Sequence, residues 1–231
     1  MLEVSGLAAG YGAVQVLWDV DVEVGESEVV ALVGSNGAGK TTLLRAISGM
    51  IAPTAGDVRL DGVSLVGRAP EDVVTAGVAH VPEGRRLFAG LTVRENLRVG
   101  AYARGGEADI DRAVELFPRL GDRLDQVTGS MSGGEQQMCA IARGLMADPQ
   151  LIMIDELSLG LAPNLVEQIL DRLTGVTEQG TSVLLIEQDV DAALETSSRG
   201  YVLENGRIIV SGNSASLRSD PRVREAYLGV A

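Results

Sequence analysis

The sequence predicts an α/β fold in which buried strands alternate with helices. Three short apolar runs, residues 29–33, 151–154 and 182–186, have the length and composition of buried strands. Each run is followed by glycine-rich or acidic residues and then by a helical segment. This alternation is typical of a parallel sheet with helices on its faces. Ligands of such sheets bind at the carboxyl ends of the strands, so we expect the functional site at that edge.

The composition is that of an ordinary globular protein. The 231 residues are 45% hydrophobic and 22% charged, which suits one domain with a substantial core. Because nucleic acids are bound by clustered Lys and Arg, the net charge of −13 argues against a nucleic-acid partner. Cys139 is the only cysteine, which excludes an intrachain disulfide, and its apolar neighbours favour a packed, unreactive thiol.

Two absences in the sequence bear on where the protein works. No stretch approaches the ~20 apolar residues that cross a bilayer. Residues 1–4 lack the basic and then apolar pattern of a secretory signal. We therefore expect a cytoplasmic chain without direct membrane insertion.

The N-terminal residues 2–33 predict short strands. Apolar and polar residues alternate over residues 16–24 with the period of a half-buried strand, and a turn is expected at Gly25. Tyr11 lies between two glycines as an exposed aromatic residue. Its ring could stack on a nucleotide base or pack against a loop, and the residues alone support these two interpretations equally.

A glycine-rich loop joins the first buried strand to a helix. It has the pattern G-x-x-x-x-G-K-[ST] and consists of Gly34, Ser35, Asn36, Gly37, Ala38, Gly39, Lys40, Thr41 and Thr42. Glycines let backbone N–H groups close around phosphate oxygens, and the following helix presents its positive end to the same anion. We expect Lys40 to reach the β and γ phosphates of a nucleotide and Thr41 to bind magnesium. A turn without function is the alternative, which Lys-Thr in this register disfavours.

The segment after this helix predicts further strands. Residues 57–60 have a strand pattern, and the Asp-Gly pair after them predicts a hairpin turn. Residues 78–81 predict a short buried strand that ends just before Glu83. His80, the only histidine, lies inside this strand, where a structural role is more common than a catalytic one.

Residues 92–146 predict several helices, opened by a Thr-x-x-Glu capping box. Within them, Ser132, Gly133, Gly134 and Glu135 precede a long helical run. The exposed N-terminus of such a helix favours anions. The Ser-Gly-Gly pattern by itself is weak evidence for a site.

Two adjacent carboxylates, Asp155 and Glu156, directly follow the apolar run 151–154. A carboxylate at the end of a buried strand can hold magnesium, directly or through water. Its neighbour can orient or deprotonate a water that attacks a phosphate. A solvated acidic pair is the alternative, but the phosphate loop upstream favours the functional interpretation.

The remaining chain completes the alternation of strands and helices. Pro163 stands where a helix is expected to begin, at a position that tolerates its missing N–H. Residues 190–195 predict another helix. Residues 201–210 predict a β-hairpin around the turn Asn205-Gly206.

The motifs occur in the order of a known family. The phosphate loop, Pro82-Glu83-Gly84, Ser132-Gly133-Gly134-Glu135-Gln136 and Asp155-Glu156 together resemble the ATP-binding cassette ATPases along essentially the whole chain. The resemblance implies a P-loop NTPase (RecA-like) core with an antiparallel β subdomain and a helical signature-motif subdomain. We expect a single nucleotide-binding domain over residues 1–231, with a core of about 1–87 and 147–231 and a helical subdomain of about 88–146. ATP and Mg²⁺ are the implied cofactors, and ATP hydrolysis is the implied reaction.

The resemblance also implies roles for single residues. The residues expected to act in catalysis are Lys40, Glu83, Glu156 and Gln188. Those expected to hold magnesium are Thr41, Asp155 and Glu83. In this assignment Lys40 stabilises charge on the phosphates, and Glu156 positions the attacking water.

Two further segments acquire nucleotide-binding roles from the same resemblance. Tyr11 becomes the residue expected to stack on adenine. Ser132, Gly133, Gly134 and Glu135 resemble the family signature, which in a head-to-tail dimer closes over the γ-phosphate held by the other subunit. Two composite ATP sites, each shared between two subunits, are therefore implied.

Four segments resemble one branch of the family: residues 81–86, 158–163, 186–188 and 226–229. That branch is the ATPase subunit of branched-chain amino acid importers, which works beside a second, related ATPase and two membrane subunits. The implied partners are transmembrane permease subunits and either a paralogous ATPase or a second copy of this chain. The implied location is peripheral, on the inner face of the cell membrane. Importers for urea or other amides share much of this sequence, so the substrate stays open between them.

The chain departs from most of the family at four positions: Glu83 replaces Gln, Leu157 replaces Pro, Leu161 replaces Asp and Gln188 replaces His. Leu157 is the one that is unusual for the branch. Without proline after it, Glu156 is held less firmly, unless the buried strand already fixes it. Gln188 cannot carry a proton and Glu83 adds charge near the γ-phosphate, so we expect slower and more magnesium-dependent hydrolysis.

These departures motivate a second hypothesis, in which the chain is a weakly hydrolysing regulatory subunit beside an active paralogue. A third hypothesis, from another class, is a soluble ATPase of DNA repair or translation. The acidic charge, the single cassette and the lack of a long coiled-coil insert count against the third.

Overall fold

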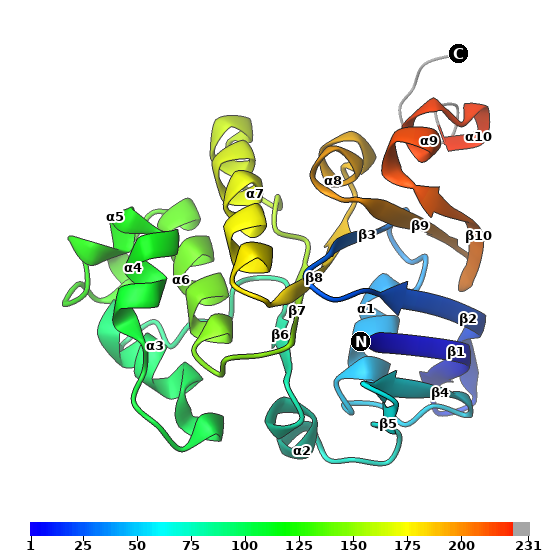
Figure 1. The fold of residues 1–231 in the computed structure, drawn as a ribbon, viewed down its shortest axis with the longest axis horizontal. Helices are drawn as coiled ribbons and strands as arrows, with labels where there is room; N and C mark the ends of the chain where they lie inside the picture. The colour runs from blue at the N-terminus through cyan, green and yellow to red at the C-terminus, as the bar shows by residue number, and fades with distance from the viewer. Residues whose placement is uncertain (224–231) are drawn as a thin grey trace.

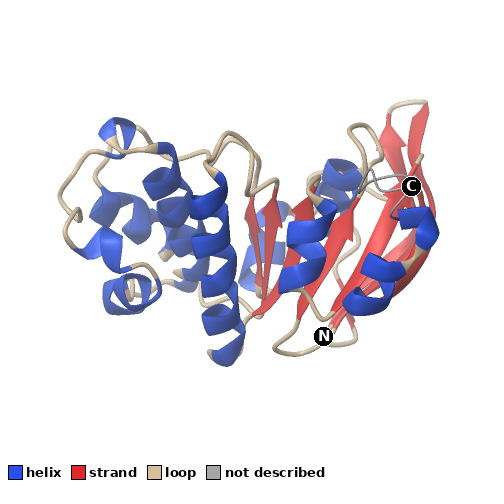
Figure 2. Ribbon diagram, turned by 90° about the horizontal axis from the view of Figure 1, so that it is seen from above, coloured by secondary structure: helices blue, strands red, loops and turns tan. Residues whose placement is uncertain are grey.

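The computed structural model describes residues 1–223, which form three parts (Figure 1). A six-stranded sheet lies in the middle and a four-stranded antiparallel sheet lies on one side of it. Helices α3 to α6, within residues 93–145, lie on the other side. The view from above shows this helical part at one end of the long axis and the strands, with further helices beside them, toward the other end (Figure 2). The helical segment expected after residue 92 is confirmed, whereas the boundaries of a helical subdomain stay a prediction. Residues 226–229, which carry part of the branch resemblance, lie outside the described residues.

The six-stranded sheet has the order β10-β9-β3-β8-β7-β6, with β9 and β10 antiparallel and the other neighbours parallel. Its strands are β3 (Val29–Val33), β6 (Val78–Val81), β7 (Leu151–Asp155), β8 (Ser182–Glu187), β9 (Arg199–Glu204) and β10 (Arg207–Asn213). β3, β7 and β8 are buried along their full length because both faces of the sheet are covered. The parallel arrangement brings the carboxyl ends of β3, β6, β7 and β8 to one edge, as the three apolar runs predicted.

The second sheet is antiparallel and has the order β2-β1-β4-β5. Its strands are β1 (Leu2–Tyr11), β2 (Val14–Val24), β4 (Ala55–Leu60) and β5 (Val63–Ser64). Along β2 the buried residues Val20, Val22 and Val24 alternate with exposed ones, which confirms the strand predicted from the period of two. The Asp61-Gly62 turn joins β4 to β5 with both residues at positive φ, as expected of a hairpin.

The helices predicted after the phosphate loop, after Thr92, at Pro163 and over 190–195 are present, whereas α2, α9 and α10 were not predicted. They are α1 (Lys40–Ile47), α2 (Pro70–Thr75), α3 (Val93–Gly100), α4 (Ile110–Leu116), α5 (Pro118–Gly121), α6 (Gly133–Leu145), α7 (Pro163–Glu178), α8 (Val190–Thr196), α9 (Ser214–Ser219) and α10 (Pro221–Val223). Short 3₁₀ turns occur at Tyr102–Arg104 and Thr128–Ser130. The capping box of Thr92 and Glu95 is present at the start of α3, and Pro163 is the first residue of α7.

The six-stranded sheet separates two apolar cores. Alternate residues of β7 illustrate this, because Ile152 and Ile154 pack with the helical residues of α3 to α8. Leu151 and Met153 pack with α1 and the antiparallel sheet on the opposite face. Cys139 lies in the first core, so the prediction of a packed thiol is confirmed, and burial raises the pKa of this thiol to about 11, which disfavours the reactive thiolate.

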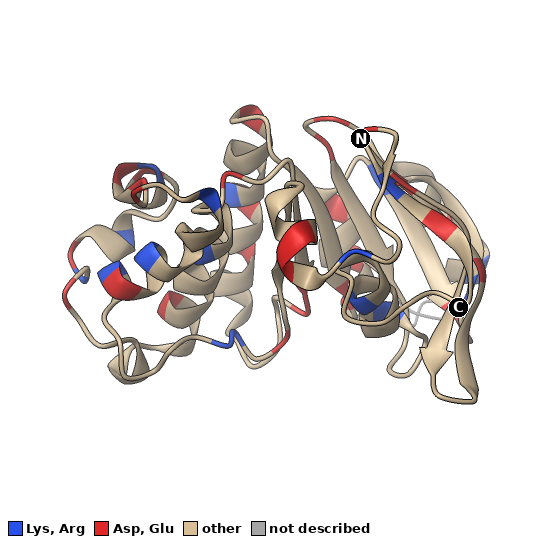
Figure 3. Cartoon of the chain, turned by 90° about the horizontal axis from the view of Figure 1, so that it is seen from below, with Lys and Arg blue, Asp and Glu red and all other residues tan. Residues whose placement is uncertain are grey.

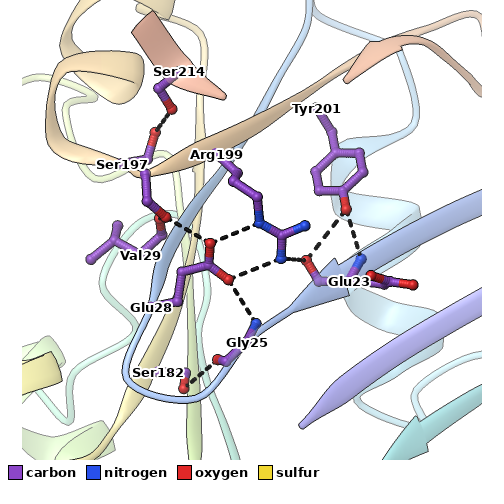
Figure 4. A network of polar contacts seen from close by, with 10 residues as sticks. Glu23, Gly25, Glu28, Val29, Ser182, Ser197, Arg199, Tyr201 and Ser214 are labelled. Carbon is purple, nitrogen blue, oxygen red and sulfur yellow. Dashed lines mark hydrogen bonds and ion pairs between the residues drawn. The ribbon is translucent and has the colours of Figure 1, made fainter. Parts of the chain in front are cut away.

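A polar network joins the two sheets at the amino-terminal end of β3 (Figure 4). Glu28 accepts hydrogen bonds from Arg199 Nε at 2.8 Å, from Arg199 Nη2 at 2.9 Å and from the backbone N–H of Gly25 at 2.8 Å. The Arg199 guanidinium foremost, with Ser198 and Gly25, lowers the pKa of Glu28 to about 2. The Tyr201 hydroxyl accepts from the backbone N–H of Glu23 on β2 at 3.1 Å. These contacts lie at the end of the sheet opposite the carboxyl-terminal edge.

In Figure 3, Lys and Arg positions alternate with Asp and Glu positions along the helices, so neither sign of charge is confined to one helix. Within residues 1–223, no helix combines the length and apolar character needed to cross a membrane.

Candidate nucleotide-binding site

The phosphate loop follows β3 directly, and its backbone requires glycine at two positions. Gly37 and Gly39 have φ of 81° and 113°, in the left-handed region that residues with a Cβ adopt only with strain. At Gly34 a Cβ would collide with the carbonyl oxygen of Leu203 on β9. The loop therefore packs against the β9–β10 hairpin while its residues lead into the N-terminus of α1.

Lys40 is the only lysine of the chain, and its side chain is 4% exposed. Its ammonium donates to the carbonyl oxygen of Gly34 at 2.8 Å and to that of Ser35 at 3.2 Å. The carboxylate of Glu156 lies 3.7 Å from the same nitrogen. The cation is thus held inside the loop, between the loop backbone and the end of β7.

Thr41 and Asp155 are brought together as expected of a magnesium site. Thr41 Oγ1 donates to Asp155 Oδ2 at 3.2 Å. Asp155 Oδ1 is buried and has no hydrogen-bond partner within the described part of the chain. Burial, together with the nearby carboxylates of Glu156 and Glu83, raises the pKa of Asp155 to about 6.

A magnesium ion fits this arrangement, because a divalent cation can be coordinated by the unpaired Oδ1 of Asp155 and can neutralise the excess negative charge of the three carboxylates. Residues 1–223 contain no group of three or more His, Cys, Asp and Glu side chains with metal-site spacing. Magnesium usually takes one or two carboxylates together with substrate phosphates, so Thr41 and Asp155 suffice on the protein side. A direct role of Glu83 as a ligand stays a prediction.

Glu156 is held from β8 despite the leucine that follows it. Its backbone N–H donates to the carbonyl oxygen of Ile186 at 2.9 Å, and Gln188 Nε2 donates to its Oε1 at 2.7 Å. Leu157 is fully buried in the core next to the helices. Glu156 itself has a left-handed φ of 49° rather than the extended angles that a following proline favours. Of the two interpretations of Leu157, the contacts support the one in which the strands already fix Glu156.

Glu83 reaches the site from the end of β6. The three residues after it, Gly84, Arg85 and Arg86, all have positive φ, which for the two arginines is uncommon. Arg143 of α6 secures this loop by donating to the carbonyl oxygen of Arg86 at 2.8 Å. This hydrogen bond links the loop after Glu83 to α6.

These side chains line one cavity of about 490 Å³. Its lining residues are Val16, Asn36, Gly37, Gly39, Lys40, Thr41, Thr42, Glu83, Glu156, Leu159 and Gln188. Two of them, Val16 and Leu159, did not emerge from the sequence. Val16 is a half-buried residue of the alternating pattern of β2, and that pattern does not indicate which position faces the cavity. Leu159 is half exposed and lies in the segment 158–163, directly after Asp155-Glu156, so its closeness in sequence to the two carboxylates is the signal that could have identified it.

Tyr11 lies close to this cavity without lining it. Its ring is 42% exposed, and its hydroxyl accepts a hydrogen bond from Arg45 Nη1 at 2.9 Å. The same hydroxyl is 3.4 Å from Thr42 Oγ1, and Thr42 is a lining residue. Stacking of Tyr11 on adenine stays a prediction.

The Ser-Gly-Gly-Glu segment is not part of the cavity within one chain. Ser132 caps α6, and its side chain and backbone N–H pair with Glu135 in a capping box. Glu135 also forms an ion pair with Arg123 at 2.7 Å. A Cβ at Gly134 would overlap the side chain of Leu165 on α7, so glycine is required for this close packing. The action of this segment on a second subunit stays a prediction.

His80 lies apart from the cavity and lines a separate hollow of about 290 Å³ between α2, α3 and α6. Both of its ring nitrogens lack a hydrogen-bond partner in the described chain. Burial foremost, with Arg45 nearby, lowers the pKa of His80 to about 4, so the ring is neutral at pH 7. Phe88 and Arg143 face the same hollow.

The fold and the cavity together define a P-loop nucleotide-binding protein. A glycine loop with a buried lysine, a threonine–aspartate pair suited to magnesium and a glutamate held by a neighbouring strand meet at the carboxyl edge of a parallel sheet. This is the set of groups that binds and cleaves nucleoside triphosphates.

Comparison with known proteins agrees with this class and narrows it. Residues 17–158 match the family model described as ABC transporter, and residues 207–231 match that of the branched-chain amino acid ATP-binding cassette transporter. The chain therefore belongs to the ABC transporter family of ATP-binding cassettes, and its enzymatic activity is ATP hydrolysis. The resemblance stated from the motifs is confirmed.

Individual relatives match over their full length. The chain is 45% identical to the high-affinity branched-chain amino acid transport ATP-binding protein BraG of Pseudomonas aeruginosa, covering 99% of this chain and 100% of the relative. It is 35% identical to the probable branched-chain amino acid transport ATP-binding protein LivF of Archaeoglobus fulgidus, covering 100% and 99%. Among solved structures, the ADP conformation of MJ1267, an ATP-binding cassette of an ABC transporter, superimposes with a TM-score of 0.88 at 26% identity, covering 100% and 99%. The predicted fold class is thereby confirmed.

Proposed function

We propose that the chain is the ATP-hydrolysing subunit of an importer for branched-chain amino acids. The assignment of branched-chain amino acids as the substrate is supported by the full-length similarity to BraG at 45% identity, together with the family match at residues 207–231. The chain itself would not touch the amino acid, because its cavity is built for phosphates. Its part is to bind and hydrolyse MgATP and to pass the resulting motion to a permease.

Nucleotide binding starts from the phosphate loop. Backbone N–H groups of the loop and the positive end of α1 surround the phosphates. Lys40 exchanges its contacts with the Gly34 and Ser35 carbonyl oxygens for phosphate oxygens. Thr41 and Asp155 would hold magnesium, which would neutralise charge on the phosphates.

Hydrolysis depends on Glu156. Its carboxylate accepts a hydrogen bond from the attacking water and aligns that water with the γ-phosphate. Gln188 holds one carboxylate oxygen at 2.7 Å, which leaves the second oxygen for the water. Because Gln188 cannot accept a proton as histidine does, its role is to position Glu156 and to hydrogen-bond a phosphate oxygen.

A complete site needs two chains. Ser132, Gly133 and Gly134 lie outside the cavity of their own chain, and in a head-to-tail dimer they would close over the γ-phosphate of the partner. The partner is a second copy of this chain or a paralogous ATPase. Closure on ATP and opening after hydrolysis supply the motion that drives transport.

The permease docks in the hollow lined by His80, Phe88 and Arg143. The hollow is partly apolar and adjoins the loop that carries Glu83, because Arg143, one of its lining residues, donates a hydrogen bond to the carbonyl oxygen of Arg86 in that loop. A permease segment seated there would sense movement of Glu83 with the nucleotide. The chain would then sit on the cytoplasmic face of the cell membrane without entering it.

The test is uptake by the assembled transporter in proteoliposomes loaded with MgATP. A tagged full-length chain should co-purify with membrane subunits and support uptake of radiolabelled leucine, and Lys40→Ala should abolish it. Uptake of urea but not of leucine would contradict the assignment of branched-chain amino acids as the transported substrate. Co-purification without any membrane subunit would reject the importer and favour a soluble ATPase.

A second candidate is a regulatory subunit that clamps ATP and hydrolyses it weakly. The observations that favour it are Glu83 and Gln188 in the cavity, which add charge and remove a proton carrier. Single-turnover hydrolysis of bound ATP separates the two candidates, because a clamp would retain ATP for many turnovers of its paralogue.

A further inference from the structure

The ends of β7 and β8 are linked by two side-chain contacts that cross each other. Gln188, just after β8, donates to Glu156, just after β7, at 2.7 Å. Ser158 donates back to Glu187 twice, from its backbone N–H to Oε1 at 2.9 Å and from its hydroxyl to Oε2 at 2.6 Å. Glu156 therefore lies between two anchored neighbours, β7 before it and Ser158 after it.

Glu187 is not a surface residue that happens to touch Ser158. It is 2% exposed, and burial raises the pKa of its carboxyl group. A buried carboxylate is tolerated only where hydrogen bonds satisfy its oxygens, and Ser158 supplies one to each oxygen. The two hydrogen bonds therefore fix the position of Ser158 relative to Glu187.

Glu156 needs such a contact because its backbone is strained. Its φ of 49° is a left-handed conformation that a residue with a side chain keeps only when its surroundings enforce it. A proline at position 157 would favour extended angles at Glu156 and so would not hold this conformation. The burial of Leu157 and the two hydrogen bonds from Ser158 to Glu187 provide the restraint.

We propose that Glu187 is a positioning residue for hydrolysis, which acts through Ser158 to hold the Glu156 carboxylate against the cavity. Neither Glu187 nor Ser158 lines the cavity, so neither touches the nucleotide. The same contact fixes the start of the segment that carries Leu159 into the cavity wall. The inference rests on the proposed role of Glu156 as the residue that aligns the water.

The test compares four variants of the full chain by single-turnover hydrolysis and by ATP affinity, with the partner ATPase added if the wild-type chain requires it. Ser158→Ala keeps the N–H contact but loses the hydroxyl, and should slow hydrolysis roughly tenfold or more while ATP affinity changes less than about twofold. Ser158→Thr restores the hydroxyl and should recover most of the rate. Glu187→Gln, which keeps one acceptor oxygen, should lie between the wild type and Glu187→Ala.

Ser182→Ala is the matched control. Ser182 is a buried serine at the opposite end of β8 whose hydroxyl donates to the carbonyl oxygen of Gly25 at 2.9 Å (Figure 4). Its loss should lower the melting temperature and leave the hydrolysis rate of the folded protein unchanged. A merely structural role of Ser158 would make the two alanine variants behave alike, and that result would overturn the proposal.

Glu156→Gln distinguishes failure of this inference from failure of the proposed function. If that variant is inactive and folded Ser158→Ala hydrolyses ATP at the wild-type rate, the positioning role of Glu187 is wrong and the role of Glu156 stands. If Glu156→Gln hydrolyses normally, the role of Glu156 is wrong and the inference falls with it.

Discussion

At the scale of single residues, the cavity is prepared for its ligand by one buried cation. Lys40 is already in place between the loop carbonyl oxygens and Glu156, with 4% of its side chain exposed. The ammonium group of Lys40 thus lies at the loop, where phosphate oxygens of a nucleotide can take the place of the two carbonyl oxygens.

Replacement of this lysine should weaken nucleotide binding strongly. Hydrogen bonds from a charged group to phosphate contribute about 1.5–3 kcal/mol each, so Lys40→Ala should weaken the affinity for ATP about 100-fold, as measured by calorimetric titration. Arg59→Ala, which removes an exposed positive charge paired with Asp57 on β4, is the control and should bind ATP normally. Equal affinity of Lys40→Ala and the wild type would disprove the assignment.

Glu83 and Gln188 should set the rate of hydrolysis and its magnesium requirement. Glu83 adds to the negative charge that raises the pKa of Asp155, so removing that charge lowers the need for a cation. We expect the double variant Glu83→Gln with Gln188→His to hydrolyse ATP faster and to reach half its maximal rate at a lower magnesium concentration. Titration of the rate with magnesium tests this, and identical curves for the variant and the wild type would contradict it.

At the scale of secondary-structure elements, the sequence predicted what depends on local patterns. The phosphate loop, the buried strands, the capping box at Thr92 and the hairpin at Asn205 were each encoded within a few neighbouring residues. Contacts between distant segments were not. Val16 lines the cavity from another sheet, and the Glu187–Ser158 contact joins the ends of two strands. Neither the position of Val16 nor this contact can be predicted from a local sequence pattern.

The N-terminus of α6 should be sensitive to added volume. Gly134→Ala would force Leu165 or the first turn of α6 to shift, because the new methyl group overlaps that side chain. We expect ATP affinity of the isolated chain to stay within about twofold, whereas ATP-dependent dimerisation falls roughly tenfold. Gly106→Ala, where an added Cβ meets open space, is the control for light-scattering measurements of the dimer. Normal dimerisation of Gly134→Ala would remove the signature segment from the interface.

The junction between the sheets should make stability depend on pH. The pKa of Glu28 is lowered from 4.5 to about 2, so its charge stabilises the folded state above pH 4.5, and this stabilisation is lost as the pH falls toward 2. Because Arg199 is 36% exposed, we expect Glu28→Gln to lower the free energy of unfolding by only about 1–2 kcal/mol at pH 7.

Urea denaturation at several pH values measures this effect. The difference between Glu28→Gln and the wild type should shrink between pH 4.5 and pH 2. Glu26→Gln, an exposed glutamate in the same turn, should be indistinguishable from the wild type. A difference for Glu28→Gln that does not change with pH would mean that the Glu28–Arg199 contact contributes through packing rather than charge.

At the scale of the whole molecule, the cavity and the Ser-Gly-Gly segment occupy different parts of one chain. The cavity lies at the carboxyl edge of the six-stranded sheet, whereas residues 132–135 at the N-terminus of α6 do not line it. The loop after Glu83 lies between them, because Arg143 of α6 donates to the carbonyl oxygen of Arg86 and both residues line the hollow at His80. This arrangement is what a subunit needs if it converts ATP hydrolysis into movement of a partner.

The measurement that tests the account most directly is single-turnover ATP hydrolysis by the wild type and by Glu156→Gln, with magnesium present and with and without the paralogous ATPase. We predict that the wild type cleaves its bound ATP, whereas Glu156→Gln binds ATP with similar affinity, does not cleave it and accumulates as a dimer. Hydrolysis by Glu156→Gln at the wild-type rate would contradict the catalytic site described for this chain.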